Sequence, residues 1–419
     1  MNKKEQLLKE IKLRGILKEI SDEQKLLNMK ENEGVYVGFD PTATSLHLGN
    51  YILINLLQRF QQAGIKTIAV LGGATGMIGD PAFVSKERVL LSNEAIIKNK
   101  NYIKTQLERF NLQVFDNFEI YKDMNVLDFL RDVGKNVNVA LLLTKDSIAS
   151  RIKTGLSFTE FSYQLIQAWD FKYLFDKFNI VGQLGGSDQW GNIVQGLDMI
   201  KKTSLSDKNN SPCFALTTEL LTDENGNKFG KTTFNGDALW LDQELTSAFK
   251  LYQFLFNLSD FQAEKVLKWL SFKPFTEIEK ILQKHSQNKK DKFLQHQVAE
   301  EITLNIHGQD ALDQSLKISS LLFNNLSFES IEQKDLDVLA KSIDNFEVKE
   351  QDFDSNKLIE LKILSSKREL NEFIRDSALQ INGEIIKSQE QIASNLKKNF
   401  DKLLIKKGKK SFFIISLTK

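Results

Sequence analysis

Two hydrophobic patterns alternate along the first half of the chain. Short apolar runs rich in β-branched and aromatic residues occupy 35–40 and 66–71, as in buried strands. Between them, residues 40–64 give a turn and then apolar side chains at helical spacing, closed by Gly64. Residues 178–200 repeat the order of apolar run, Gly-Gly turn and amphipathic stretch. This alternation predicts an α/β fold, a doubly wound parallel sheet with crossover helices.

The second half of the chain shows other patterns. Residues 243–335 carry Phe, Leu and Lys at helical spacing and predict an α-helical domain. Residues 336–350 lie in an acidic, polar stretch and predict a linker. Residues 351–419 combine two predicted helices with three predicted strands, which makes a small α+β module. With the sheet domain over 1–242, the chain is expected to hold three domains.

Composition narrows the class of protein. Hydrophobic residues make up 41% and charged residues 26% of the chain, values typical of a globular protein. The single cysteine, Cys213, excludes an intramolecular disulfide framework and a multi-cysteine zinc site. The first residues contain no apolar core of signal-peptide length, and no later apolar run is long enough to span a bilayer. We therefore expect a cytoplasmic protein without membrane contact.

Residues 38–50, GFDPTATSLHLGN, place polar side chains at the start of a predicted helix. Thr44 or Ser45 can cap that helix, and His47 and Asn50 lie three residues apart on its first turn. A helix N-terminus offers unpaired N–H groups and a partial positive charge, which suits a triphosphate. Alone, the pattern is more typical of a capped helix with a surface histidine.

A second loop changes that interpretation. Residues 223–242 place Lys228 and Lys231 on either side of a glycine, where two ammonium groups can neutralise charge on a polyphosphate. Alone, this loop too is more typical of solvated surface. In the first loop, Gly49 leaves room for an adenine or a ribose. Together the two loops favour a site for a nucleoside triphosphate.

Both loops resemble signatures of a known family. GFDPTATSLHLGN resembles the HIGH signature, and KFGKT at 228–232 resembles the KMSKS signature, of class I aminoacyl-tRNA synthetases. The stretches YVGFDPTA, GGATGMIGDP, SFTEFSYQLIQAWDF and GGSDQWGN are similar to bacterial-type tyrosyl-tRNA synthetases in particular. The likeness begins near Lys12, continues to the C-terminus and is strongest over 36–242.

The resemblance implies an organisation and a reaction. A Rossmann-like catalytic domain with a dimer-forming insertion precedes a tRNA-contacting helical domain and a small RNA-binding domain like that of a ribosomal protein. Such an enzyme activates L-tyrosine with ATP and Mg²⁺ to tyrosyl-adenylate and pyrophosphate, then transfers tyrosyl to the 3′ terminal adenosine of its tRNA. The implied partners are L-tyrosine, ATP, the tRNA for tyrosine and a second copy of the chain. No protein-bound metal site is expected.

The resemblance also implies roles for individual residues. Those implied for tyrosine are Tyr36, Asp80, Tyr163, Gln167, Asp170 and Gln189. Those implied for ATP are Gly38, Asp40, His47, Gly49, Asn50, Gly186, Asp188 and Lys231, and those implied for catalysis are Thr42, His47, Asn50, Lys228, Lys231 and Thr232. The chemistry is consistent, because a buried phenol needs an acceptor and a donor, which Asp170 and Tyr36 supply. No general base is required, since the carboxylate of tyrosine is already ionised near neutral pH.

Two positions depart from the family pattern. Asn50 stands where the HIGH signature usually has its second histidine, but its amide still donates a hydrogen bond, so we expect activity to survive. In the loop 82–86, Phe-Val-Ser replaces a glycine and two lysines, and Lys86 comes slightly later. Arg88 aligns with the family. Of all the matched stretches, the loop 82–86 matches the family pattern least well.

Charge points to RNA at the C-terminal end. The 56 Lys and Arg residues nearly balance the 55 Asp and Glu residues, so a polyanion must be met by a local basic patch. The residues implied for RNA binding are Lys367, Arg368, Lys387, Lys406, Lys407, Lys409 and Lys410. Such a patch favours phosphate contacts, which position RNA without reading its sequence. Without the resemblance, a lysine-rich solubilising surface is equally compatible with this pattern.

Three other hypotheses stay open. A tryptophanyl enzyme is the nearest, but it would not pair Tyr36 with Asp170 against a phenol. A non-catalytic RNA-binding protein derived from a synthetase is expected to have damaged ATP loops, and the plain alteration is confined to 82–86. A general nucleotide-binding dehydrogenase needs a glycine fingerprint and an acidic residue at ribose spacing, which the sequence lacks.

Overall fold

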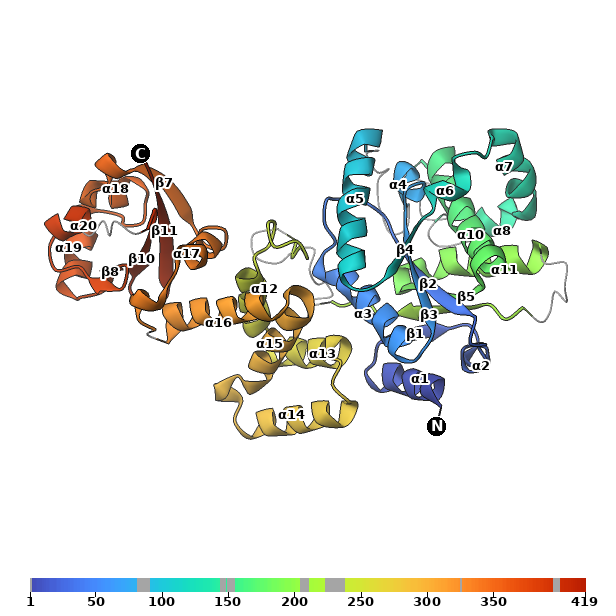
Figure 1. Cartoon of the computed structure of the whole chain (residues 1–419), viewed down its shortest axis with the longest axis horizontal. Coiled ribbons are helices and arrows are strands. Elements are labelled where there is room, and N and C mark those ends of the chain that lie inside the picture. Colours follow the sequence, from blue (N-terminus) through green and yellow to red (C-terminus); the bar gives the residue numbers. More distant parts are fainter. Residues whose placement is uncertain are drawn as a thin grey trace. The chain divides into compact units, whose positions relative to one another are not determined.

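A computed structural model of the chain describes residues 2–80, 91–143, 148, 155–203, 211–222, 238–324, 326–394 and 400–419 (Figure 1). The chain forms two compact units. The first joins Met1–Leu241 with Glu264–Ile281, and the second joins Asp242–Ala263 with Leu282–Lys419.

A six-stranded sheet organises the first unit, with the strand order β1-β6-β5-β2-β3-β4. The strands are β1 (Leu17–Ile20), β2 (Gly34–Phe39), β3 (Lys66–Leu71), β4 (Gln113–Asp116), β5 (Ile180–Gly186) and β6 (Phe214–Thr218). Neighbouring strands run parallel, except that β1 is antiparallel to β6. In the register, Tyr36 lies between Ile68 and Gln183. The doubly wound parallel sheet predicted from the sequence is confirmed.

Helices cover both faces of this sheet. Helix α3 (Leu48–Gln62) connects β2 to β3, α5 (Asn93–Arg109) connects β3 to β4, and α11 (Trp190–Thr203) connects β5 to β6. Crossover connections between parallel strands are right-handed. The connection from β5 to β6 leads across the sheet in the opposite direction to the connections from β2 to β3 and from β3 to β4, so α11 lies on the face opposite α3 and α5. Helix α10 (Phe158–Phe178) packs beside α11 (Figure 1). The strand order reverses between β2 and β5, where this class of fold binds ligands.

Shorter elements fill the connections of the first unit. They are α1 (Lys3–Leu13), α2 (Glu23–Leu27), α4 (Thr75–Ile78), α6 (Phe118–Tyr121), α7 (Val126–Asp132), η1 (Gly134–Asn136), α8 (Val139–Leu143) and η2 (Ser187–Gln189). A small apolar cluster joins the α7–α8 region to α10 and α11, and its buried members are Val133, Leu142, Leu165, Ala168 and Met199. The described parts of the segment between β4 and β5 therefore pack against α11.

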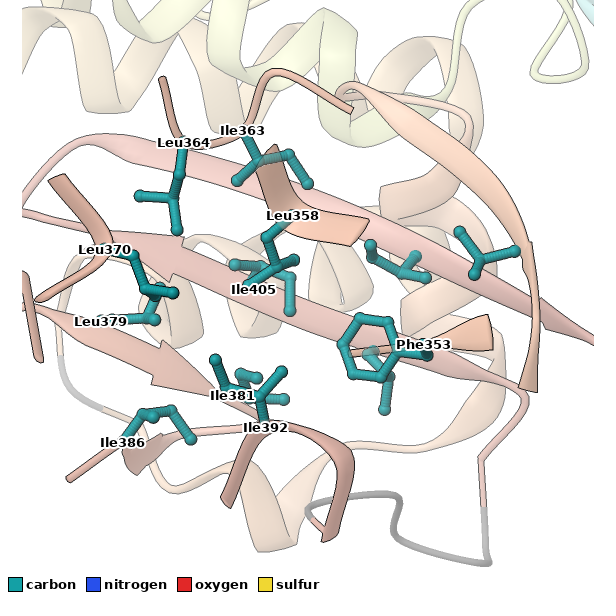
Figure 2. Packing of buried hydrophobic residues seen from close by; sticks show 13 residues of the cluster. Phe353, Leu358, Ile363, Leu364, Leu370, Leu379, Ile381, Ile386, Ile392 and Ile405 are labelled. Carbon is teal, nitrogen blue, oxygen red and sulfur yellow. The ribbon is translucent and has the colours of Figure 1, made fainter. Parts of the chain in front are cut away.

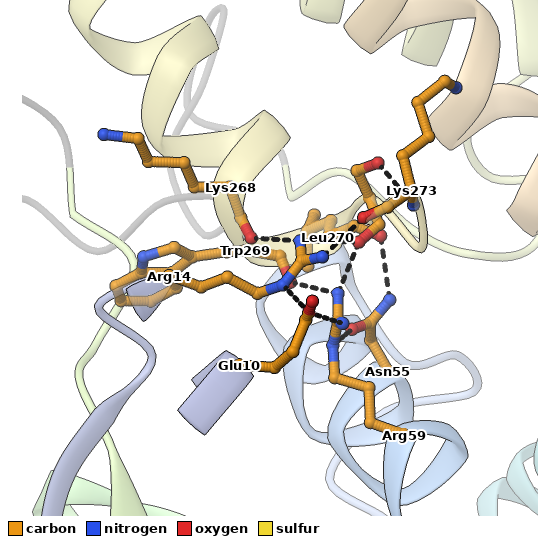
Figure 3. Close-up of polar contacts among 9 residues, drawn as sticks. Glu10, Arg14, Asn55, Arg59, Lys268, Trp269, Leu270 and Lys273 are labelled. Carbon is orange, nitrogen blue, oxygen red and sulfur yellow. Dashed lines mark hydrogen bonds and ion pairs between the residues drawn. The ribbon is translucent and has the colours of Figure 1, made fainter. Parts of the chain in front are cut away.

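Two buried arginines fasten the end of α13 (Asp260–Leu270) within the first unit (Figure 3). Arg14 and Arg59, 2% and 6% exposed, donate to main-chain carbonyls between residues 268 and 273. Asn55 donates to one more carbonyl of this stretch. Glu10 pairs with both arginines and lies 2.6 Å from Arg14. The carbonyls at a helix C-terminus carry partial negative charge, so they and Glu10 compensate the buried guanidinium groups.

The second unit begins with helices. Helices α12 (Ala248–Phe256), α15 (Phe293–His307) and α16 (Gln309–Phe323) pack against one another, followed by α17 (Gln333–Ala340). Short 3₁₀ turns form η3 (Lys289–Asp291) and η4 (Phe328–Ser330), and the boundary between the units falls within α13 and α14 (Phe275–Gln287). In the described part of the chain, no helix is long and apolar enough to cross a membrane.

A five-stranded sheet forms the C-terminal module, in the order β7-β11-β10-β8-β9. Its strands are β7 (Asn345–Lys349), β8 (Leu379–Ile381), β9 (Glu384–Ile385), β10 (Lys402–Lys407) and β11 (Ser411–Thr418). Its helices are η5 (Glu350–Asp352), α18 (Ser355–Glu360), α19 (Lys367–Arg375) and α20 (Glu390–Ser394). Figure 2 shows the apolar side chains from these helices and strands, among them Leu358, Leu370 and Ile405, which are fully buried.

Residues 336–350 are not a linker, contrary to the sequence-based expectation. They contain the end of α17 and the whole of β7, which pairs in parallel with β11. Strand β7 is polar because it is an edge strand, and Val348 is its one buried side chain. Asp354 lies just beyond this stretch. It caps α18 by accepting from two main-chain N–H groups.

Candidate active site

Polar side chains gather where the parallel strands of the first unit end. Asp40 follows β2, Asn117 follows β4, and η2 follows β5. Carboxyl ends of parallel strands meet at one edge of a sheet, and the switch point between β2 and β5 lies at this edge. The described residues among those predicted for tyrosine and ATP come to this edge from strands and helices far apart in the sequence.

Asp170 on α10 is the most buried carboxylate of this group, at 3% exposed. Its Oδ1 accepts from the hydroxyl of Tyr121 at 2.6 Å, and its Oδ2 accepts from Asn117 Nδ2 at 2.9 Å. Burial raises the pKa of Asp170 to about 7, although both hydrogen bonds act in the opposite direction. Its two donors hold the carboxylate in one orientation.

Tyr36 lies next to this carboxylate. Its ring meets Phe171 edge to face at a centroid distance of 5.5 Å. Burial, and then the charge of Asp170, raise the pKa of Tyr36 well above its usual value. Among the described residues, the buried Tyr36 hydroxyl finds no hydrogen-bond partner, nor does Oε1 of Gln183, its neighbour on β5. Buried polar atoms are rarely left unpaired, so these two atoms indicate a place that a ligand fills.

A second carboxylate, Asp40, is joined to Asp170 by hydrogen bonds. Asp40 Oδ2 accepts from the hydroxyl of Tyr163 at 2.8 Å, and its Oδ1 accepts from Thr75 Oγ1 at 2.6 Å. Asn117 Nδ2, which donates to Asp170, also lies 3.3 Å from Thr75 Oγ1. Gly72 is required here, because a Cβ would lie 2.0 Å from Asp40 Oδ1.

Three more residues predicted to bind the substrate tyrosine contact one another through their side chains. Gln189 Nε2 donates to Asp80 Oδ2 at 2.7 Å, and Gln167 Nε2 donates to Gln189 Oε1 at 3.4 Å. The charges of Asp40 and Asp80 both raise the pKa of Tyr163, after the larger effect of burial. Asp80 therefore lies near Tyr163, and both are among the residues that the resemblance implies for tyrosine.

His47 and Asn50 cap helix α3 reciprocally. His47 Nδ1 accepts from the main-chain N–H of Asn50 at 3.3 Å, and Asn50 Oδ1 accepts from the main-chain N–H of His47 at 3.0 Å. The prediction that Thr44 or Ser45 caps this helix is wrong, because helical geometry begins after His47. With Nδ1 accepting, the neutral imidazole carries its hydrogen on Nε2, which makes Nε2 a donor.

The remaining residues predicted for ATP surround the same edge. Thr42 is exposed, and its N–H donates to the carbonyl of Asp40 at 2.9 Å. A Cβ on Gly38 would meet no atom within 4 Å, so the sheet is open beside Tyr36. Gly186 ends β5 and Asp188 lies in η2, while Gly49 lies in the first turn of α3. Lys228, Lys231, Thr232 and the loop 82–86 with Arg88 lie outside the described residues.

The residues predicted for RNA differ in how free their charges are. Lys367, Arg368, Lys387, Lys409 and Lys410 are exposed. Lys407 instead pairs with Glu369 at 2.7 Å and donates to the carbonyl of Ile363. Lys406 lies over the ring of Phe412, 5.6 Å from its centroid. The ion pair between Glu369 and Lys407 joins α19 to β10.

Sequence reasoning missed the residues that hold the predicted ones in place. Asn117 and Tyr121 donate to the carboxylate of Asp170, and Thr75 donates to that of Asp40. Gln183 shares the face of Tyr36. The available signal was position, since Asn117 directly follows the short strand β4. Among the described residues, no group of three His, Cys, Asp or Glu side chains could hold a metal ion.

Comparisons with known proteins agree over the whole chain. Residues 28–324 match the family described as tRNA synthetases class I (W and Y), and residues 335–415 match the Tyrosine--tRNA ligase SYY-like C-terminal domain. The tyrosine--tRNA ligase of Mesomycoplasma hyopneumoniae strain J is 56% identical over 414 residues, 99% of each chain. That of Mycoplasmopsis pulmonis is 48% identical over 417 residues, again 99% of each.

A solved structure shows the same fold. The C-terminally truncated mitochondrial tyrosyl-tRNA synthetase of Aspergillus nidulans superposes with a TM-score of 0.68 at 30% identity, covering 75% of this chain and 94% of that one. Sequence, domain composition and fold all lead to one family. The chain belongs to the tyrosine--tRNA ligases among the class I tRNA synthetases.

Proposed function

We propose that the edge of the sheet between β2 and β5 is where this chain activates L-tyrosine with ATP, before transferring tyrosyl to the 3′ terminal adenosine of its tRNA. The observation that carries this proposal is the buried Tyr36 hydroxyl, which lies beside the carboxylate of Asp170 and finds no hydrogen-bond partner within the described part of the chain. A substrate phenol supplies the missing partner. Its O–H donates to Asp170, and its oxygen accepts from Tyr36.

This pocket selects tyrosine by what it leaves unpaired with other substrates. Phenylalanine has no hydroxyl, so it would supply no donor to Asp170 and no acceptor to the Tyr36 hydroxyl. A site built to hydrogen-bond a substrate hydroxyl strongly rejects a substrate that lacks it. No editing domain is needed when the difference is a hydrogen-bonding group. An indole N–H could satisfy Asp170 but would offer no acceptor to Tyr36, which disfavours tryptophan.

The other end of the amino acid meets the second group of side chains. Asp80, Tyr163 and Gln167 are proposed to hold the α-amino group, a cation that requires a carboxylate and further acceptors. The Asp80–Gln189 hydrogen bond of 2.7 Å supports this, because it places Gln189 beside the amino-group site, where its amide can reach the tyrosine carboxylate. Asp188, after the Gly186 turn, is proposed to contact the ribose of ATP.

ATP is proposed to lie at the N-terminus of α3. His47 Nε2 and the hydroxyl of Thr42 donate to the γ-phosphate, and Asn50 supports His47 through the reciprocal cap. Gly38 and Gly49 leave room for the ribose and adenine beside Asp40. Lys228 and Lys231 are proposed to add positive charge, and Thr232 a hydroxyl donor, as the pentacoordinate phosphate forms. Magnesium enters with ATP, as part of the substrate.

Two further proposals concern partners. A homodimer is supported by exposed apolar side chains on α7, α8 and the start of α10, namely Val126, Leu127, Leu130, Val139, Leu143 and Phe158. Sedimentation of the full chain at the mass of a monomer would refute it. The exposed cations of the C-terminal module are proposed to contact tRNA phosphates. We also propose that the chain acts in the cytoplasm.

One assay tests the proposed reaction: exchange of labelled pyrophosphate into ATP with tyrosine, tryptophan or phenylalanine. We expect exchange with tyrosine and almost none with the other two. Exchange with tryptophan would overturn the account of the phenol pocket. No exchange with any of the three, together with retained RNA binding, would support the non-catalytic alternative.

A further inference from the structure

Helix α5 carries two buried polar side chains that none of the roles above uses. Asn99 and Gln106 are both 7% exposed, although this helix is otherwise charged on its outer side. They are seven residues apart, which places them on one face of the helix, two turns from each other. Buried amides are kept where they satisfy something specific, so their partners define their role.

Both amides reach the backbone that leads into the His47 cap. Asn99 Nδ2 donates to the carbonyl of Pro41 at 3.0 Å. Gln106 Oε1 accepts from the main-chain N–H of Leu46 at 2.9 Å, and its Nε2 donates to Ser45 Oγ at 2.9 Å. Gln106 therefore fixes Ser45 and Leu46, the two residues immediately before His47, which is the N-cap of α3.

The same backbone is held on its other side by a short antiparallel pairing. The Leu241 N–H donates to the carbonyl of Leu46, and the Leu48 N–H donates to the carbonyl of Leu239, both at 2.8 Å. The Trp240 ring lies 6.4 Å from the His47 ring. Helix α5 reaches this second segment too, because Arg109 donates to the carbonyl of Leu241 at 3.2 Å. Residues 45–48 are thus clamped between α5 and 239–241.

We propose that Gln106 is a positioning residue for ATP. By holding Leu46 it sets the direction in which His47 Nε2 and the N-terminus of α3 point, and so the placement of the phosphates. This inference rests on the proposed role of His47. The hydrogen bonds of Gln106 go to residues 45 and 46 and not to Tyr36 or Asp170, so the effect is confined to ATP.

The decisive variant is Gln106→Met, which keeps the length of the side chain and removes both hydrogen bonds. The buried Leu46 N–H then lacks a partner, and the backbone before His47 shifts to regain one. We expect kcat/KM for ATP in pyrophosphate exchange to fall at least about 10-fold, the cost of one unsatisfied buried donor. The Kd for tyrosine, measured without ATP, stays within about two-fold of the wild type.

A matched control lies on α3. Gln58 also links α3 to the region of α5, since its Nε2 donates to the carbonyl of Phe110 at 3.3 Å, but it lies far from the His47 cap. Gln58→Met removes one such link without touching residues 45–48 and is expected to leave both constants unchanged. A second, milder variant guards against misfolding. Ser45→Ala removes the hydroxyl that accepts from Gln106 Nε2 and donates to the Leu46 carbonyl, but it keeps the hydrogen bond from the Leu46 N–H to Gln106. It is expected to lower kcat/KM for ATP about three-fold.

Two results would overturn the proposal. One is a loss of ATP use in Gln106→Met no larger than that in Gln58→Met. The other is an equal weakening of tyrosine and ATP, which indicates general damage to the fold. If the wild type shows no exchange at all, the proposed reaction fails instead. Direct calorimetry of ATP binding then still tests Gln106, because the variant must bind ATP more weakly than the wild type.

Discussion

The phenol pocket and the basic surface of the C-terminal module handle charge in opposite ways. Asp170 is 3% exposed, and two neutral donors fix both of its oxygens. Arg368 is 89% exposed and forms an ion pair with Glu372 on its own helix. Burial makes the pocket costly to fill with the wrong group, whereas exposure makes the surface tolerant of many phosphate arrangements. Under the proposed function, we therefore expect substrate selection in the first region and salt-dependent affinity for RNA in the second.

Lys407 is an exception within the basic surface. It belongs there by sequence, but it is 21% exposed and pairs with Glu369 at 2.7 Å. That ion pair and the main-chain N–H of Ser365 lower the pKa of Glu369 to about 2. Lys407 is therefore committed to the fold of the module, and its charge is less available to RNA than that of Lys409 or Lys410.

The largest effect is expected from removing the exposed cations together. The variant replaces Lys367, Arg368, Lys387, Lys409 and Lys410 by alanine. At 50 mM salt its affinity for tRNA should fall roughly 100- to 1000-fold, and the slope of log affinity against log salt should flatten by about 0.7 to 0.9 for each phosphate that is no longer neutralised. Tyrosine-dependent pyrophosphate exchange should be unchanged. Filter binding over a salt series measures both the affinity and its slope.

The control for this variant removes five exposed lysines of the first unit, Lys3, Lys9, Lys30, Lys98 and Lys104. It carries the same change in net charge. If it weakens tRNA binding as much as the C-terminal variant does, the affinity comes from net charge, and the C-terminal surface has no special role.

Next in size is the replacement of Asp170 by asparagine. The substrate phenol loses a charge-assisted hydrogen bond, so kcat/KM for tyrosine should fall about 10- to 100-fold. The value for phenylalanine should barely change, which erodes selectivity. Asp176→Asn is the matched control, because Asp176 lies on the same helix but is exposed and pairs with Lys172. An unchanged ratio of tyrosine to phenylalanine in Asp170→Asn would remove our account of the pocket.

The raised pKa of Asp170 predicts a pH dependence. The stronger, charge-assisted hydrogen bond from the phenol requires the ionised carboxylate. With a pKa of about 7, tyrosine use should therefore rise by up to about 10-fold between pH 6 and pH 8. Stability moves the other way. The folded protein keeps a proton that the unfolded chain releases above about pH 4, so the free energy of unfolding should fall as pH rises from about 4 to about 7.

The Asp170→Asn protein provides the check on both trends. It should show a flat pH profile for tyrosine use over this range and a smaller loss of unfolding free energy, measured by denaturant titration at each pH. A wild-type profile that is flat between pH 6 and pH 8 would show that Asp170 is already fully ionised at pH 6.

The centre of the sheet was predictable from the sequence because β2, β3 and β5 are buried on both faces along most of their length. Continuous apolar runs such as 66–71 and 180–184 admit few other interpretations, and glycines mark where each strand ends. The polar residues at the start of α3 were also predictable from the sequence, because His47 and Asn50 are only three residues apart. Their pairing as a reciprocal cap was not predicted, because Ser and Thr cap helices far more often than His.

The supporting residues could not be found in this way. Asn117 and Tyr121 reach Asp170 from a segment about fifty residues away, and Gln106 reaches Leu46 from another. These contacts depend on tertiary packing. A single amide side chain such as that of Gln106 produces no sequence pattern that tells it apart from other polar residues of a helix. Strand β7 was missed because an edge strand with one buried side chain is polar enough to look like a linker.

The smallest effect concerns the exception, Lys407. Glu369→Gln keeps the shape of the side chain and removes the ion pair, which should lower the free energy of unfolding at pH 7 by less than about 1 kcal/mol, since the pair is partly exposed. The lowered pKa of Glu369 means that its contribution is complete above about pH 4.5 and is lost as the pH falls towards 2. The difference between variant and wild type should therefore disappear at low pH.

The same variant also tests whether Lys407 is withheld from RNA. Without Glu369, its ammonium group keeps the Ile363 carbonyl but loses its counter-charge, so tRNA affinity should rise slightly, about two-fold at low salt. Ser366→Ala, which removes only the cap of α19, is the control for a general loosening of the helix. A fall in affinity with Glu369→Gln would mean that the ion pair orients Lys407 towards phosphate, and Lys407 would then join the exposed cations in function.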